Sequence, residues 1–200
     1  MKILGRRALF PLVLVITLQA AGCLGGTSAP PRLYVLAAVD GPVVSGDRAL
    51  SVGVGPVSLA GYLDRPQIVT RPAADKIDVA EFDRWGEPLR DAIARVLAED
   101  LSRQLPAAKI SMFPWRGLEA VRYQVVVEIT RFDGPAAGDT ALEARWGILD
   151  AASGKEVAAK TTRLAEPAGG AGYSMTVSAM SRALGALSRD IAQTLLVLPR

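Results

Sequence analysis

Residues 121–164 read VRYQVVVEITRFDGPAAGDTALEARWGILDAASGKEVAAKTTRL, and this stretch decides the fold class. Apolar and polar side chains alternate in VRYQVVVEITRF (121–132) and again in ALEARWGILD (141–150), which is the period of a strand with one buried face. The turns DGPAAGD and AASGK separate these segments from each other and from EVAAKTTRL (156–164). Consecutive strands with such short connections pair antiparallel, so the stretch predicts a three-stranded meander.

Two segments outside the meander change to the period of a helix. After Pro88, which suits a first helical turn, apolar residues recur at steps of three and four, and a second segment repeats this spacing near the C-terminal end. The apolar positions are Leu89, Ile93, Val96, Leu97 and Leu101 in the first segment, and Val177, Met180, Leu184, Leu187, Ile191 and Leu195 in the second. Both segments are therefore predicted to be amphipathic helices.

The remaining strands are predicted on either side of the first helix. They are RLYVLAAV (32–39), ALSVGVGPVSL (49–59), a hairpin of QIVTR (67–71) and KIDVAEF (76–82), and KISMFPW (109–115). We expect the second of these to end at Pro56 or just beyond it, and KISMFPW to be a buried strand end. The order of strands, helix, strands and helix predicts a single α/β (α+β-like) domain, with one mixed, mostly antiparallel sheet and two main amphipathic helices packed on it.

The N-terminal end has the pattern of an export signal. Lys2, Arg6 and Arg7 precede an apolar run too short to cross a bilayer core of roughly 30 Å, and Ala20-Ala21-Gly22 supplies small residues for cleavage. The only cysteine, Cys23, follows directly. This arrangement predicts a lipoprotein, in which the chain is cut before Cys23 and the thiol and the new N-terminus carry acyl groups such as palmitate.

The predicted organisation is a cleaved signal peptide (1–22), a lipidated cysteine with a flexible tether (23–31), and the α/β domain (32–200). Cleavage removes three basic residues and no acidic ones, which leaves a mature chain with 20 basic and 20 acidic residues. A formally neutral chain gives no electrostatic reason to bind nucleic acid. Leu24 stands where aspartate would favour retention at the inner membrane, so we expect lipid anchoring at the outer membrane, facing the periplasm.

Several kinds of catalytic chemistry are excluded by composition. The chain has no histidine and, once Cys23 is acylated, no free thiol, so it cannot build a Ser-His-Asp, a Cys-His or a usual His/Cys zinc site. Gly53-Val54-Gly55-Pro56 and Gly169-Gly170-Ala171-Gly172 lack the partners of a nucleotide-binding loop. Glu99-Asp100 is expected on the solvated face of a helix. We therefore predict no catalytic residue, no metal ligand, no cofactor and no enzymatic activity.

The loop GYLDRP (61–66) is the candidate contact segment. Glycine and proline interrupt the strand pattern there, so Tyr62, Leu63, Asp64 and Arg65 are predicted to lie in a loop and to bind a partner, with Tyr62 and Leu63 less buried than elsewhere. The alternative is a loop that packs on its own domain.

Long parts of the chain resemble a known family. RLYVLAAV, VGVGPVSLAGYLDRPQIVTR and FDRWGEPLRDAIARVLAEDLSRQL, and later FPW, VVVEITRFDG and LEARWGILD, are similar to the ABC-type transport auxiliary lipoproteins, the group that includes the paraquat-inducible lipoprotein PqiC. The resemblance is most specific at Leu63–Val69 and Trp85–Leu89. It implies a mixed α/β sheet with flanking helices and no catalytic motif.

The resemblance also implies a function. Such a lipoprotein would dock a periplasm-spanning MCE-domain protein of an inner-membrane ABC-type lipid transport system at the outer membrane, and would support envelope integrity. If that partner is a closed ring, our hypothesis is that the lipoprotein forms a homo-oligomer around the same axis. Three alternatives stay open at this point. They are a lipoprotein that activates a periplasmic enzyme or assembles a secretion complex, a small domain that carries lipid in its own cavity, and a hydrolase, which the missing histidine disfavours.

Overall fold

The computed structural model describes residues 29–44, 50–115, 121–136 and 138–198. The chain divides into two units, 1–30 and 31–200, and the elements below belong to the second. Cys23 and the predicted signal peptide lie outside the described residues. Within the described part, neither helix combines the length and the apolar character that a membrane span requires.

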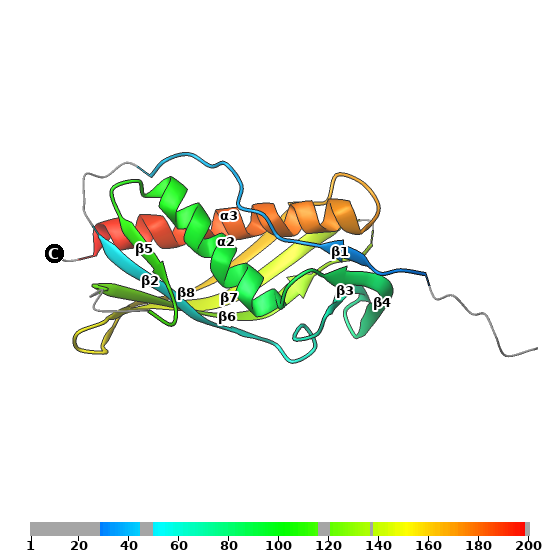
Figure 1. Ribbon diagram of the computed structural model, residues 1–200, viewed down its shortest axis with the longest axis horizontal. Helices are drawn as coiled ribbons and strands as arrows, with labels where there is room; N and C mark the ends of the chain where they lie inside the picture. The colour runs from blue at the N-terminus through cyan, green and yellow to red at the C-terminus, as the bar shows by residue number, and fades with distance from the viewer. Residues whose placement is uncertain (1–28, 45–49, 116–120, 137, 199–200) are drawn as a thin grey trace, which may run out of the picture. The chain divides into compact units, whose positions relative to one another are not determined.

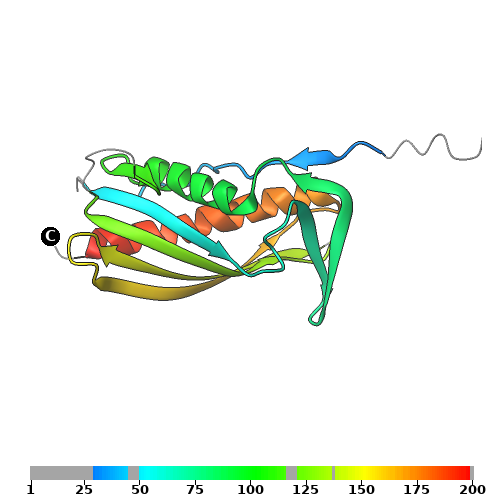
Figure 2. The same cartoon turned by 60° about the horizontal axis from the view of Figure 1, so that its bottom comes forward.

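A five-stranded sheet forms the larger layer of the domain (Figures 1 and 2). Its order is β5 (Lys109–Met112), β2 (Ser51–Leu59), β6 (Tyr123–Asp133), β7 (Asp139–Asp150) and β8 (Glu156–Pro167). The strands β6, β7 and β8 pair antiparallel in sequence order, which confirms the predicted meander. β2 runs parallel to both of its neighbours, β5 and β6.

A second, three-stranded sheet has the order β1 (Arg32–Tyr34), β4 (Lys76–Trp85) and β3 (Gln67–Ala73). β3 and β4 form the predicted antiparallel hairpin, and β1 lies parallel to β4. The predicted α/β class is confirmed, but the strands are divided between two mixed sheets. The loop at residues 60–66 explains the division, because it ends the pairing of β2 with β6 and turns the chain toward the hairpin, which stands off the larger sheet in Figure 2.

The helices α2 (Leu89–Gln104) and α3 (Tyr173–Val197) cover one face of the five-stranded sheet, as Figure 2 shows. Every apolar helix position predicted from the spacing is buried, and together with the inner face of the sheet these positions make the core. The inner strand positions include Val52, Val54, Val125, Val127, Ile129, Leu142 and Ile148. The opposite face of the sheet has no helix on it in the described part of the chain (Figure 2).

The β2–β5 edge confirms one prediction and departs from another. β2 ends at Leu59, just beyond Pro56 as expected, and a register shift between Val54 and Val57 lets the strand continue past the proline. The expectation that KISMFPW is a buried strand end is wrong. Its first four residues form β5, which among the described strands pairs with β2 alone and is an edge strand, and Phe113 is 48% exposed. The Trp115 ring lies on β2, where a Cβ atom at Gly53 would come within 2.2 Å of Cη2. Glycine is therefore required at this position for packing.

Candidate functional site

Two segments that are about 20 residues apart in the chain enclose a hollow at the start of α2. We call this hollow, bordered by Asp64–Pro66 and Trp85–Leu89, the notch; its volume is about 390 Å³. The amide of Trp85 donates a hydrogen bond of 2.7 Å to the carbonyl of Pro66, which fixes the two segments side by side. The notch thus joins the two stretches in which the family resemblance is most specific.

Leu63 anchors the loop of residues 61–66 in the core with its side chain. Its amide donates to the carbonyl of Ala60 at 2.9 Å, and its side chain is only 2% exposed within the core. The prediction that Leu63 is less buried than elsewhere is wrong. The turn directs this apolar side chain inward, so Leu63 anchors the loop and is not available to a partner.

Tyr62 is also engaged within the domain. Its hydroxyl donates to Asp133 on β6 at 2.5 Å, and the Arg71 guanidinium lies 5.1 Å from the centre of its ring. Burial, followed by the hydrogen bond to Asp133, raises the pKa of Tyr62 above its ordinary value. For Tyr62 and Leu63 the structure therefore matches the alternative expectation, in which the loop packs on its own domain.

Asp64 and Arg65 face the notch instead. Asp64 accepts a hydrogen bond of 2.6 Å from Arg90 on α2, and both side chains are about half exposed. Arg65 is partly buried, and its Nε atom is buried without a hydrogen-bond partner among the described residues. Of the four predicted contact residues, the structure leaves these two at an accessible surface, and their role in binding stays a prediction.

A second ion-pair cluster fixes the other side of the notch. Arg95 contacts Glu87 at 2.5 Å and Glu99 at 3.1 Å, and it donates to the carbonyl of Leu36 at 2.9 Å. The hydrogen bond with Glu87 is the main cause of a raised pKa at Arg95. Arg95 therefore ties Glu87, which lines the notch, to α2 and to the chain that follows β1.

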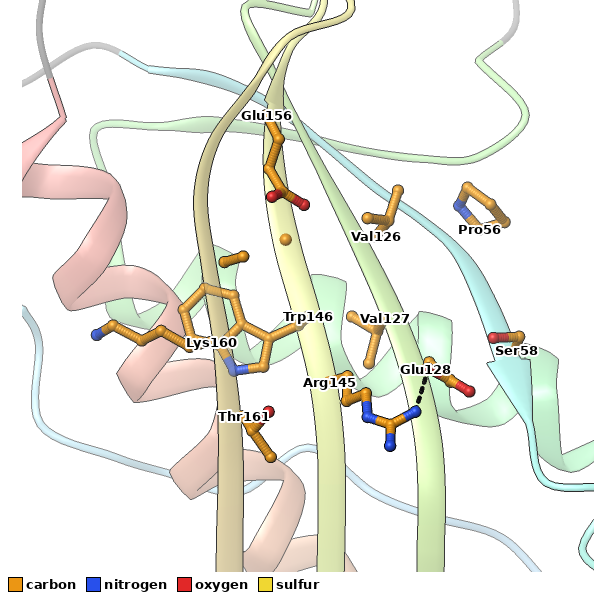
Figure 3. A pocket seen from close by; sticks show the side chains of 12 residues that line it. Pro56, Ser58, Val126, Val127, Glu128, Arg145, Trp146, Glu156, Lys160 and Thr161 are labelled. Atoms are coloured by element: carbon orange, nitrogen blue, oxygen red, sulfur yellow. Dashed lines mark hydrogen bonds and ion pairs between the residues drawn. The ribbon is translucent and has the colours of Figure 1, made fainter.

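A larger hollow lies on the uncovered face of the five-stranded sheet and was missed by the sequence analysis. Figure 3 shows this groove, whose volume is about 630 Å³. Val126, Gly147 and Ala159 are among the residues that line it, and so are Glu128 and Arg145, whose charged groups lie 3.5 Å apart. The small residues on this face were the available signal, but they occupied ordinary outward positions in the alternating pattern.

The ionic groups of the notch are arginines and carboxylates. Across the described residues, no three or more histidine, cysteine, aspartate or glutamate side chains are grouped as a metal site would require. Arginine with planar donors recognises carboxylates and phosphates by paired hydrogen bonds. The arrangement is therefore suited to binding a charged group.

Comparison with known protein families identifies the family of this chain. The model of the ABC-type transport auxiliary lipoprotein component family matches residues 34–192. The chain belongs to this family. The match covers both segments of the notch and confirms the resemblance found in the sequence. This family is one of auxiliary lipoprotein components and not a known enzyme family, and membership indicates attachment to a membrane.

Two solved structures have a similar fold. A Xanthomonas campestris protein of the DUF330 family superposes with a TM-score of 0.71 at 17% identity, covering 83% of this chain and 95% of that one. The crystal structure of an uncharacterized protein gives a TM-score of 0.68 at 21% identity and covers 83% and 99% of the two chains. At these identities the likeness establishes the fold alone. Among functionally curated proteins, no sequence matches this chain.

Proposed function

We propose that this auxiliary lipoprotein is a non-catalytic docking subunit at the outer membrane. It would hold the periplasm-spanning MCE-domain protein of an ABC-type lipid transport system and so support envelope integrity. The observation that carries the proposal is the notch, where the two most family-specific segments meet, joined by a backbone hydrogen bond, in an accessible hollow. Membership of a family of ABC-type transport auxiliary components supports the choice of a transport protein as the partner.

The distance from the membrane fits a docking role. The tether between Cys23 and Arg32 has eight residues and reaches at most about 26 Å. If Cys23 is acylated, the domain works close to the bilayer, and an elongated partner must come to it. Leu24 favours the outer membrane as the place of anchoring. A ring-shaped partner would in addition favour a homo-oligomer of this lipoprotein around the same axis.

Pull-down after crosslinking in intact cells tests the proposal, with the lipidated full-length protein as bait and mass spectrometry as readout. We expect an MCE-domain protein among the captured partners. Pro66→Trp, which places a large ring in the notch, should abolish capture. The matched control Thr161→Trp, which fills the groove of Figure 3, should leave capture unchanged. Melting curves check that both variants are folded.

The other outcomes are equally informative. Capture of a peptidoglycan synthase or a secretion component by the wild-type protein would favour the alternative function. If Thr161→Trp abolishes capture of the MCE-domain protein and Pro66→Trp does not, the interface lies at the groove and not at the notch. If the wild-type protein captures no transport component at all, the docking role is wrong.

A further inference from the structure

The charges around the notch are unequally matched. Both of its carboxylates have a cationic partner, since Asp64 pairs with Arg90 at 2.6 Å and Glu87 pairs with Arg95 at 2.5 Å. Arg65 borders the same hollow and forms no ion pair with any described residue. The notch therefore presents one guanidinium whose charge the described domain does not balance.

Arg65 is also incompletely hydrogen-bonded. Its Nε atom is buried without a partner in the described residues, and a buried donor without an acceptor is unfavourable. The side chain as a whole is only partly buried, and a guanidinium bound by a carboxylate can form two parallel hydrogen bonds. A carboxylate supplied from outside would therefore balance the charge of Arg65.

The other residues that line the notch indicate which kind of group accompanies the incoming carboxylate. Pro66, Trp85, Pro88 and Leu89 contribute apolar surface. A cavity of about 390 Å³ has room for one or two side chains but not for a lipid with two acyl chains. Phosphate groups are commonly recognised by clusters of arginines, whereas the notch offers one unmatched arginine. The occupant that fits is a protein segment with an acidic group next to apolar residues.

Resting on the docking function proposed above, we propose that Arg65 binds a carboxylate of the partner protein in the notch. The pairs Asp64–Arg90 and Glu87–Arg95 serve the same recognition, because they keep the notch's own carboxylates from Arg65 and leave it for the partner. Asp64 and Glu87 are thus positioning residues, and Arg65 makes the contact.

The experiment uses the full-length lipidated protein in intact cells with a photo-crosslinking amino acid at Asp91, an exposed position in the first turn of α2. Arg65→Glu and Arg65→Gln should lower the yield of the crosslinked partner about tenfold or more, because a buried charge is left unpaired. Arg65→Lys, which keeps the charge, should retain part of the yield. The control Arg84→Glu, an exposed charge reversal on β4, should change it less than about twofold.

Mapping the crosslinked peptide completes the test. We expect a partner segment with Asp, Glu or a C-terminal carboxylate, and reversal of that charge to Arg should restore the yield with Arg65→Glu. A partner captured equally well by wild type and Arg65→Glu, while Pro66→Trp abolishes capture, would overturn the carboxylate contact and leave the docking function standing. A crosslink to lipid instead of protein would also overturn it. Absence of any transport partner with the wild type would count against the docking function itself.

Discussion

Buried aspartates occur both in the strands and in the helix layer, and the hydrogen bonding of their carboxylates differs between these two regions. Asp83 on β4 and Asp133 at the end of β6 are 3% and 0% exposed, and Asp100 in α2 is 0% exposed. The first two are surrounded by donors. Asp100 is not, and the difference shows that burial alone does not tell whether a charged residue stabilises a fold.

Asp133 joins three elements near the notch. It accepts hydrogen bonds from Tyr62 at 2.5 Å, from Arg71 at 3.0 Å and from Arg131 at 3.1 Å. Asp83 has two donor residues, of which Arg32 donates twice, at 2.7 and 2.6 Å, and Tyr34 once, at 2.8 Å. Buried charges that are fully hydrogen-bonded in this way hold their elements in one arrangement.

Asp100 has one partner for two oxygens. One oxygen accepts from the amide of Val39 at 3.0 Å, while Oδ2 has no hydrogen-bond partner among the described residues. Burial raises the pKa of Asp100 to about 6. The expectation of a solvated position for Asp100 is therefore wrong. The segment after β1 and the helix α3 pack on a second side of α2, and this widens the buried arc beyond the apolar stripe.

The largest expected effect comes from removing the Asp133 carboxylate, which accepts hydrogen bonds from three residues. Asp133→Ala should lower the free energy of unfolding by about 3–5 kcal/mol, because it leaves Arg71 and Arg131 near a buried space without their shared carboxylate. Urea unfolding at pH 7.5 measures the change. The control Asp75→Ala, in the exposed turn between β3 and β4, should stay within about 0.5 kcal/mol. Equal stabilities of the two variants would mean that the Asp133 network does not fasten the loop.

These buried networks mark the limit of what could be predicted from the sequence. Local periodicity was sufficient for α2, α3 and the β6–β8 meander, because each depends on neighbours in the chain. The separation into two sheets depends on long-range pairing, such as that of β1 with β4. In the candidate site, the loop and its polar residues were predicted, but the burial of Leu63 was not. Its inward direction depends on how the loop folds against the rest of the domain.

Replacement of Asp100 should have the opposite sign. Asp100→Asn removes a charge that burial disfavours and can keep the bond to Val39, so it should raise the free energy of unfolding at pH 7.5 by roughly 1–3 kcal/mol. The native pKa lies above the unfolded value, so the wild type binds the proton more readily when folded and becomes relatively more stable as pH falls from 6 toward 4. The gain from Asp100→Asn should therefore shrink over that range.

Asp91 on the same helix provides the contrast for this prediction. It is exposed in the first turn of α2, where a negative charge interacts favourably with the helix dipole. Asp91→Asn should therefore lower the free energy of unfolding by up to about 0.5 kcal/mol. A loss of stability in Asp100→Asn at pH 7.5 would show that the charged form of Asp100 is in fact well solvated or paired.

The smallest expected effect concerns the exposed partner of a buried aspartate. Arg32 beside Asp83 holds the pKa of that carboxyl below its usual range. The paired state therefore contributes stability at neutral pH, and this contribution is lost as pH falls below about 4. Arg32→Gln should lower the free energy of unfolding at pH 7.5 by less than Asp133→Ala lowers it or Asp100→Asn raises it, because Arg32 is largely solvated and Tyr34 still donates to Asp83.

The pH profile separates this effect from a general loss of packing. The difference between wild type and Arg32→Gln should diminish as pH falls from about 5 toward 2, whereas a packing defect would persist. The control Arg84→Gln removes an exposed arginine from the strand next to β1 and should show no such trend. A constant difference across this range would mean that Arg32 acts on β1 through its contacts and not through the charge of Asp83. The stability difference caused by Asp100→Asn should fade between pH 6 and 4, and that caused by Arg32→Gln between about pH 5 and 2. The two pH profiles would therefore separate the contribution of Asp100 to stability from that of Asp83.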